Sequence, residues 1–180
     1  MFQYLRATSN HQLILRCGAS SNPTLLGYAN ADWASDVNDR KSTSGYVFML
    51  GGAAISWSSK KQTSVALSST EAEYIAGAHA AKEAVWLRQL LSELGQDMSP
   101  PTVLRIDNQS AIAIARNPEF HDRTKHIDVR YHFLQQVVDS GMVELVYTPT
   151  GEQVADVLTK GLPPTSHNKF RSIMGIHHLD

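Results

Sequence analysis

The chain has 180 residues, of which 42% are hydrophobic and 18% are charged. This balance is typical of one folded domain and is too apolar for a disordered segment. There are 16 lysines and arginines against 17 aspartates and glutamates, so the net charge of -1 excludes a strongly basic nucleic-acid binder.

The cysteine content and the distribution of apolar residues exclude further classes of protein. The single cysteine, Cys17, rules out an internal disulfide framework and a cysteine-rich zinc site. No apolar run approaches the roughly 20 residues of a membrane-spanning helix, so we expect no membrane partner. Attraction to nucleic acid would have to come from local basic clusters, which can equally be solvated surface. Three such clusters exist: Arg40-Lys41, Lys60-Lys61, and the stretch with Arg123, Lys125, His126 and Arg130.

The first half of the chain contains mostly strand signals. Residues 1–23 contain a short helical stretch and the strand-like run Leu13-Ile14-Leu15, followed by a loop. Alternation over residues 25–32 predicts a strand with Leu26, Tyr28, Asn30 and Asp32 on one side. Two apolar runs, 46–50 and 53–57, surround Gly51-Gly52 and predict a β-hairpin.

The second half alternates helices and strands. Residues 69–94 have the strongest helical periodicity. Their apolar stripe consists of Ala72, Ile75, Ala76, His79, Trp86, Leu87, Leu90 and Leu94. Further helices are predicted over residues 109–116, 126–140 and 152–160, and strands over residues 103–107 and 142–147. This order predicts an α/β fold in which helices flank a mixed sheet. Few apolar residues follow residue 162, and we expect His177-His178 to lie in a frayed tail.

Carboxylates at the ends of the predicted strands are the strongest chemical signal. Asp32 ends the first strand of the hairpin block, and Asp107 ends the fourth strand after an apolar run. An unpaired carboxylate buried at such a place costs several kcal/mol, so a partner cation is one explanation. The alternatives are that Asp107 caps the helix at Gln109 and that Asp32 is a turn residue. Oxygen ligands without clustered cysteine or histidine favour Mg²⁺ or Mn²⁺ over zinc.

A family resemblance extends from about Tyr28 to Leu162. The chain resembles the ribonuclease H domain of copia-type retrotransposon Pol polyproteins, and residues 1–23 resemble the end of the reverse transcriptase that precedes this domain. The motifs that carry the resemblance occur in this order: ADWASD, DRKSTSGYVFMLGGAAISWSSKKQ, ALSSTEAEYIA, EAVWLRQLLSELG, IDNQSAI, NPEFHDRTKHIDVRYHF and QVADVLTKGL.

The resemblance implies a ribonuclease H fold and a metal site. The fold would be a five-stranded mixed sheet, with its first three strands antiparallel, flanked by helices. Asp32, Asp107 and Asp156 match the three aspartates of the family's Asp-Glu-Asp-Asp site, which would bind two Mg²⁺ ions or, in their place, Mn²⁺. A helical wheel does not choose between Glu71 and Glu73 for the glutamate. We prefer Glu73, because the family's glutamate precedes an apolar pair and a small residue.

The resemblance also implies domain boundaries, partners and a place in the cell. Residues 1–23 would be a remnant of the reverse transcriptase or its connection region, residues 24–162 the ribonuclease H domain, and residues 163–180 a C-terminal tail. The expected partners are an RNA–DNA hybrid and the reverse transcriptase domain of the same polyprotein, with no small-molecule cofactor. We expect the protein in the cytoplasm, within a virus-like particle, or in the nucleus.

The substrate would be held by donors close to the metal site. A hybrid is bound through its phosphates and recognised by 2′-hydroxyl groups across a wide minor groove. The candidates for these contacts are Arg40, Lys41, Ser42, Thr43, Ser44, Asn108 and Gln109, with Arg123, Lys125, His126 and Arg130 farther along. The polar members of this set can equally serve turns and caps. Many relatives carry a histidine in the loop before the last helix, whereas residues 148–153 contain none, so His126 is a possible substitute.

The carboxylates and the family resemblance are compatible with three functions, which they favour to different degrees. The first is an endonuclease that hydrolyses the RNA strand of an RNA–DNA hybrid during reverse transcription. The second is a non-catalytic relative, decayed or domesticated, that binds nucleic acid or packs against the polymerase. An integrase or transposase on the same fold is disfavoured, because its last carboxylate is usually a glutamate and the chain has Asp156 at that place.

Overall fold

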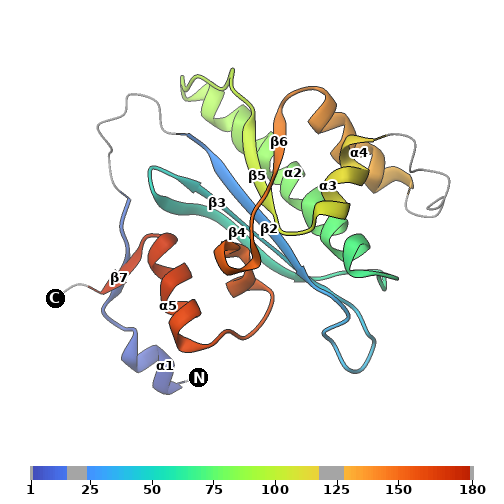
Figure 1. Cartoon of the computed structure of the whole chain (residues 1–180). Coiled ribbons are helices and arrows are strands. Elements are labelled where there is room, and N and C mark those ends of the chain that lie inside the picture. Colours follow the sequence, from blue (N-terminus) through green and yellow to red (C-terminus); the bar gives the residue numbers. More distant parts are fainter. Residues whose placement is uncertain (1, 16–23, 118–127, 179–180) are drawn as a thin grey trace.

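The computed structural model describes residues 2–15, 24–117 and 128–178. Its centre is a five-stranded mixed sheet with the strand order β4-β3-β2-β5-β6 (Figure 1). The strands are β2 (Leu26–Asp32), β3 (Thr43–Leu50), β4 (Ala53–Lys61), β5 (Thr102–Ile106) and β6 (Val143–Tyr147). The first three are antiparallel, and β5 is parallel to both β2 and β6. The predicted fold class and sheet are therefore confirmed.

Local chemistry explains the hairpin and the long helix. Gly51 and Gly52, which connect β3 to β4, both have positive φ angles, as a tight hairpin turn requires. Helix α2 (Ser69–Glu93) begins where the Ser68 hydroxyl accepts a hydrogen bond from the Glu71 backbone N–H. Each predicted element of the block from β2 to β5 is present, within a few residues of its expected bounds.

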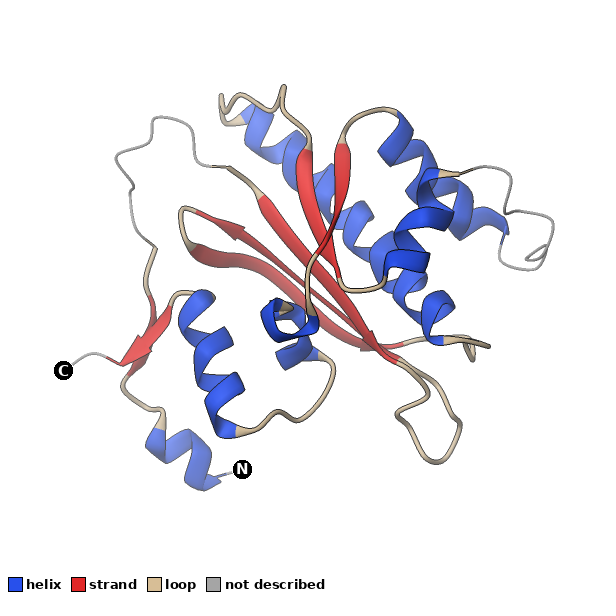
Figure 2. Ribbon diagram, in the orientation of Figure 1, coloured by secondary structure: helices blue, strands red, loops and turns tan. Residues whose placement is uncertain are grey.

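The sheet separates two layers (Figure 2). Helix α2, together with α3 (Gln109–Arg116) and α4 (Asp128–Asp139), packs over one face around the larger apolar core. The other face carries the single-turn 3₁₀ helices η2 (Thr150–Glu152) and η3 (Val154–Leu158) and the helix α5 (Pro164–Ile173), which enclose a smaller core. Within the described residues, no helix has both the length and the apolar character needed to cross a membrane.

The apolar stripe predicted for α2 is partly wrong. Its members Ala72, Ile75, Ala76 and Leu87 are buried as predicted, whereas Trp86, Leu90 and Leu94 are exposed. Leu91, which was not part of the predicted stripe, is buried. The face of α2 that meets the sheet is lined largely by alanines, so the helix packs closely against the strands. Because small residues line the buried face, the large apolar residues in the second half of α2 do not by themselves identify that face.

The tail prediction was wrong. Residues 176–178 form strand β7, which pairs antiparallel with β1 (His11–Leu13) in a second, two-stranded sheet beside α1 (Phe2–Ala7). Phe170 of α5 is 2% exposed in the smaller core, and the Met174 carbonyl accepts a hydrogen bond from the Ala54 backbone N–H of β4. The C-terminal segment is thus held by backbone pairing with partners distant in the sequence, which local apolar content does not reveal.

Candidate active site

The candidate site lies where β2 and β5 diverge. The two strands are parallel neighbours, and their pairing extends only to Tyr28 and Arg105. The chain continues from β2 to β3 on one side of this point and from β5 to β6 on the other. Such a change in strand order leaves a crevice at the carboxyl ends of the strands, where ligands bind in open α/β sheets. Asp32 is the last residue of β2, and Asp107 directly follows β5.

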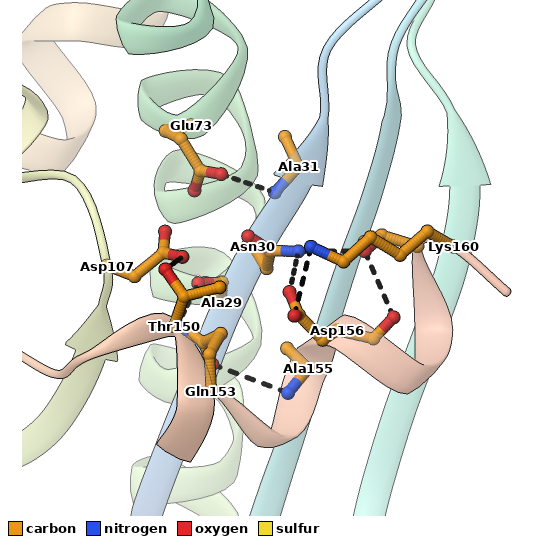
Figure 3. A network of polar contacts seen from close by, with 11 residues as sticks. Ala29, Asn30, Ala31, Glu73, Asp107, Thr150, Gln153, Ala155, Asp156 and Lys160 are labelled. Atoms are coloured by element: carbon orange, nitrogen blue, oxygen red, sulfur yellow. Dashed lines mark hydrogen bonds and ion pairs between the residues drawn. The ribbon is translucent and has the colours of Figure 1, made fainter. Parts of the chain in front are cut away.

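Glu73 enters this crevice from the start of α2 (Figure 3). Its side chain is buried, and Oε1 accepts a hydrogen bond of 2.9 Å from the Ala31 backbone N–H. The other oxygen, Oε2, is buried without a hydrogen-bond partner among the described residues. The pKa of Glu73 is raised to about 8, chiefly by burial and in smaller part by the charges of Asp107 and Asp156, against the effect of the Ala31 hydrogen bond. A buried oxygen without a donor, beside two further carboxylates, fits a cation ligand.

The competing glutamate has another contact. Glu71 Oε2 accepts a hydrogen bond of 2.8 Å from the Leu67 backbone N–H, and the Glu71 backbone N–H donates to the Ser68 hydroxyl. These bonds complete the beginning of α2. The structure therefore places Glu71 in the cap of the helix and Glu73 toward the other carboxylates.

Asp156 reaches the site from η3 on the opposite face of the sheet. The residue is 3% exposed, and its Oδ1 accepts a hydrogen bond of 2.6 Å from the Asn30 side-chain amide. Oδ2 lies 3.0 Å from the Lys160 ammonium nitrogen. Burial raises the pKa of Asp156, Lys160 opposes this effect, and the charges of Asp107 and Asp32 add to it. Asp156 therefore lies within electrostatic reach of Asp32, Asp107 and Glu73.

Asp107 faces the site and does not cap a helix. Its Oδ2 accepts a hydrogen bond of 2.9 Å from the Thr150 hydroxyl of η2. The cap of α3 is instead Asn108, whose Oδ1 accepts a hydrogen bond from the Ala111 backbone N–H. The alternative role of Asp107 as a helix cap is therefore wrong, and Asn108 is committed to the helix.

The predicted last helix, residues 152–160, is instead the pair of 3₁₀ turns η2 and η3. Gln153 interrupts the helix in an extended conformation, because its buried side-chain amide donates to the carbonyls of Ala29 and Arg105. These carbonyls belong to β2 and β5 near the place where the two strands part. These two hydrogen bonds hold η3, and with it Asp156, over the crevice between β2 and β5.

In this arrangement the carboxylates are held by donors of the protein. Within the described ranges, no three side chains of histidine, cysteine, aspartate or glutamate lie close enough to enclose a metal ion. Ala31, Thr150 and Asn30 each bind one carboxylate, and Lys160 lies against the most deeply buried aspartate. Mutual repulsion of like charges opposes a closer approach while these donors are the only partners.

The structure removes two of the predicted substrate contacts. The Ser42 hydroxyl is fully buried and accepts a hydrogen bond from the Ala34 backbone N–H, and the buried Ser44 hydroxyl accepts one from Gln62. Both hydroxyls therefore stabilise the fold, and the prediction that they contact the substrate is wrong. Ser42 directly precedes β3, and Ser44 is the second residue of that strand.

The other predicted substrate contacts differ in accessibility. Arg40 and Gln109 are exposed, Lys41 and Thr43 are half-buried, and Lys41 lies 3.8 Å from Asp39 in a surface ion pair. Three of the remaining candidates, Arg123, Lys125 and His126, lie outside the described residues. Arg130 lies on α4, and its side chain is also outside the description.

Sequence reasoning missed the residues that position the carboxylates, namely Asn30, Thr150, Gln153, Thr159 and Lys160. A weak signal existed for Asn30, because it alternates with Asp32 on one side of an apolar strand. A polar residue at a buried strand position needs a partner. The partner, Asp156, is 126 residues away in the sequence and could not be identified from Asn30 itself.

Comparisons with known proteins agree with the architecture. The chain is 44% identical over 177 residues to the retrovirus-related Pol polyprotein of transposon TNT 1-94 from Nicotiana tabacum, with 98% of the chain and 13% of that protein covered. It is also 44% identical over 176 residues to the Pol polyprotein of transposon RE1 from Arabidopsis thaliana, again with 98% of the chain but 12% of the relative covered. The chain thus spans about an eighth of the length of these relatives. No family model matches the chain.

Solved structures share the fold at low sequence identity. The N-terminal RNase H domain of a Mycobacterium tuberculosis protein has a TM-score of 0.54 at 13% identity, over 84% of this chain and 98% of that one. LC11-RNase H1, solved in complex with an RNA/DNA hybrid, has a TM-score of 0.53 at 15% identity, over 76% and 94% of the two chains. At such identities the likeness demonstrates the fold alone.

Proposed function

We propose that this chain is a metal-dependent nuclease that hydrolyses the RNA strand of an RNA–DNA hybrid. It would be the ribonuclease H domain of a retrovirus-related Pol polyprotein of a transposon, because it is 44% identical to two such polyproteins over 98% of its length and shares its fold with ribonuclease H domains. The substrate is the hybrid produced when a polymerase copies RNA into DNA. The observation that carries the proposal is the buried Glu73 Oε2, which lacks a hydrogen-bond partner among the described residues. The pKa of the Glu73 carboxyl group is raised by burial and, to a smaller extent, by the charges of Asp107 and Asp156. A buried acidic cluster of this kind fits divalent cations with oxygen ligands.

Asp32, Glu73, Asp107 and Asp156 would hold two Mg²⁺ ions, or Mn²⁺ in their place. When bound, such a pair of ions activates a water molecule and stabilises the oxygen that leaves the phosphodiester. The protein itself orients the carboxylates that would bind the ions. The Ala31 backbone N–H fixes Glu73, the Thr150 hydroxyl fixes Asp107, and the Asn30 amide fixes Asp156. Each bond restrains a carboxylate from a different element, which prepares the site for its ligand.

The hybrid would lie across the crevice, with accessible side chains beside the carboxylates. Arg40, Lys41, Thr43 and Gln109 remain candidates for contacts with phosphates and 2′-hydroxyl groups. A structural relative that was solved with an RNA/DNA hybrid supports this class of substrate. The net charge of -1 predicts weak binding by this domain alone, because affinity for nucleic acid rises with the number of phosphates neutralised. The polymerase domain of the same polyprotein would then supply most of the affinity.

The test is cleavage of a hybrid whose RNA strand is labelled, in Mg²⁺ and in EDTA. Wild type is expected to cut the RNA of the hybrid and to leave double-stranded DNA intact. Asp107→Asn is expected to lower the cleavage rate by about a hundredfold, because the amide keeps a partner for the Thr150 hydroxyl but removes a negative charge from the metal site.

Two outcomes would count against this proposal. Equal cleavage by wild type and Asp107→Asn would place the chemistry elsewhere. Binding of the hybrid without cleavage in Mg²⁺ or Mn²⁺ would identify the chain as a non-catalytic relative. Folding of Asp107→Asn should be checked by its urea midpoint, so that a lost activity is not a lost structure.

A further inference from the structure

Lys160 forms an ion pair with Asp156, one of the four carboxylates of the candidate site, and has no role in the proposed function. It directly follows the last turn of η3, where its backbone N–H donates to the Asp156 carbonyl. Its side chain folds back along the same turn, so that the ammonium nitrogen lies 3.0 Å from Asp156 Oδ2 (Figure 3). The Lys160 side chain is 37% exposed, whereas that of Asp156 is 4% exposed. The pair therefore joins a buried anion to a cation that solvent can reach.

The two oxygens of Asp156 have partners of different kinds. Oδ1 is bound at 2.6 Å by Asn30, which is itself buried in β2 and donates a second hydrogen bond to the Thr159 hydroxyl. The hydrogen bond from Asn30 is therefore fixed in position, because Asn30 is part of a central strand of the sheet. Oδ2 is bound by an ammonium group on a flexible four-carbon stem. Of the two partners, Lys160 is the one that can leave without moving the backbone.

We propose that Lys160 is a resident counter-ion of this site: it neutralises Asp156 while no divalent ion is bound, and it must leave Oδ2 before that oxygen can take one. The inference rests on the proposed function only in treating Asp156 as a metal ligand. Lys160 is thereby a positioning residue. It keeps the Asp156 carboxylate in place in the free domain and raises the concentration of divalent ion that the site requires.

The test is Mn²⁺ binding in the absence of nucleic acid, measured by the electron paramagnetic resonance signal of free Mn²⁺. Lys160→Met keeps most of the aliphatic stem and removes the charge. It is expected to bind Mn²⁺ about tenfold more tightly than wild type, because a unit charge close to the ion no longer opposes binding. Lys160→Arg keeps the charge and is expected to restore the affinity of wild type.

A matched control separates this local effect from the change in net charge. Lys82 lies on α2, nine residues after Glu73 and therefore about 13 Å farther along the helix. Lys82→Met is expected to leave the affinity for Mn²⁺ unchanged. A second readout is thermal stability: Lys160→Met should unfold at a lower temperature than wild type in EDTA, and should gain more from added Mn²⁺.

Equal or weaker Mn²⁺ binding by Lys160→Met would overturn the inference, as would a failure of Lys160→Arg to restore wild-type affinity. Absence of Mn²⁺ binding to wild type and both variants would overturn it as well. The nuclease activity is measured in a separate experiment. If wild type cleaves the hybrid but Lys160→Met does not bind Mn²⁺ more tightly, the proposed function is retained and the role of Lys160 is rejected. Tighter Mn²⁺ binding by Lys160→Met without any cleavage by wild type would support Lys160 as counter-ion and contradict the nuclease.

Discussion

Replacing Glu73 with glutamine is expected to make the metal-free domain more stable at pH 8 and to abolish hybrid cleavage. In the folded chain burial raises the pKa of Glu73 to about 8, with the charges of Asp107 and Asp156 adding to the effect. The folded state therefore holds the proton more tightly than the unfolded state does. This contribution favours folding below about pH 4.5, the ordinary value, and is progressively lost as the pH rises through about 8.

The glutamine variant removes this loss because it carries no charge at any pH. Its carbonyl can still accept the Ala31 hydrogen bond, and its amide can donate to a neighbouring carboxylate. A change of one in a pKa corresponds to about 1.4 kcal/mol, so the rise of the Glu73 pKa from 4.5 to about 8 predicts a gain of about 4 kcal/mol at pH 8 in EDTA. Urea denaturation at pH 5 and at pH 8 measures it, and the gain should be much smaller at pH 5.

Cleavage by Glu73→Gln should fall by about a thousandfold, since a neutral amide is a poor ligand for Mg²⁺. Glu71→Gln is the matched control. Glu71 lies two positions before Glu73, but its carboxylate caps the start of α2 by accepting a hydrogen bond from the Leu67 backbone N–H. It should therefore retain cleavage and lose a little stability at both pH values. A Glu73→Gln variant that is no more stable than wild type at pH 8 would contradict the argument that burial destabilises the Glu73 carboxylate. A variant with full cleavage activity would show that Glu73 is not a metal ligand.

Replacing Gly45 with valine is expected to destabilise the domain by about 3 kcal/mol and to displace Asp156. Gly45 lies in β3 opposite Asn30, directly beneath η3. A Cβ atom at this position would lie 2.8 Å from Thr159 Cγ2 and 2.9 Å from Leu158 Cβ. These atoms belong to the end of the segment that carries Asp156, so the segment must move outward. Overpacking of a filled site costs about 1–3 kcal/mol, and close contacts with both Thr159 and Leu158 place this substitution at the upper end.

Gly161→Val is the control for the general effect of valine, because a Cβ atom at Gly161 meets nothing within 4 Å. A compensating variant tests the mechanism. Adding Thr159→Ser to Gly45→Val removes the methyl group of the closest contact and keeps the hydroxyl that accepts from Asn30. Part of the stability and of the Mn²⁺ affinity should return. If Gly45→Val and Gly161→Val have the same urea midpoint, the close approach of η3 to β3 does not limit stability.

The sequence alone was sufficient for the order of the central elements and for the places of the carboxylates. Strand alternation ends at Asp32, the apolar run before Asp107 predicts β5, and the hairpin follows from Gly51-Gly52. These are local properties, since periodicity and turn chemistry depend on residues a few positions apart. The resemblance supplied the matching of Glu73 and Asp156, which local patterns left open.

The tertiary structure decided which side chains are free to act and what holds them. Asp156 is positioned by Asn30, 126 residues away, and by a 3₁₀ turn that forms because Gln153 is drawn into the space between two strands. The same packing buries Ser42, which the sequence offered as a substrate contact, and pairs β1 with β7. Such contacts join segments far apart in the chain, and their free energy depends on burial, which no local pattern contains.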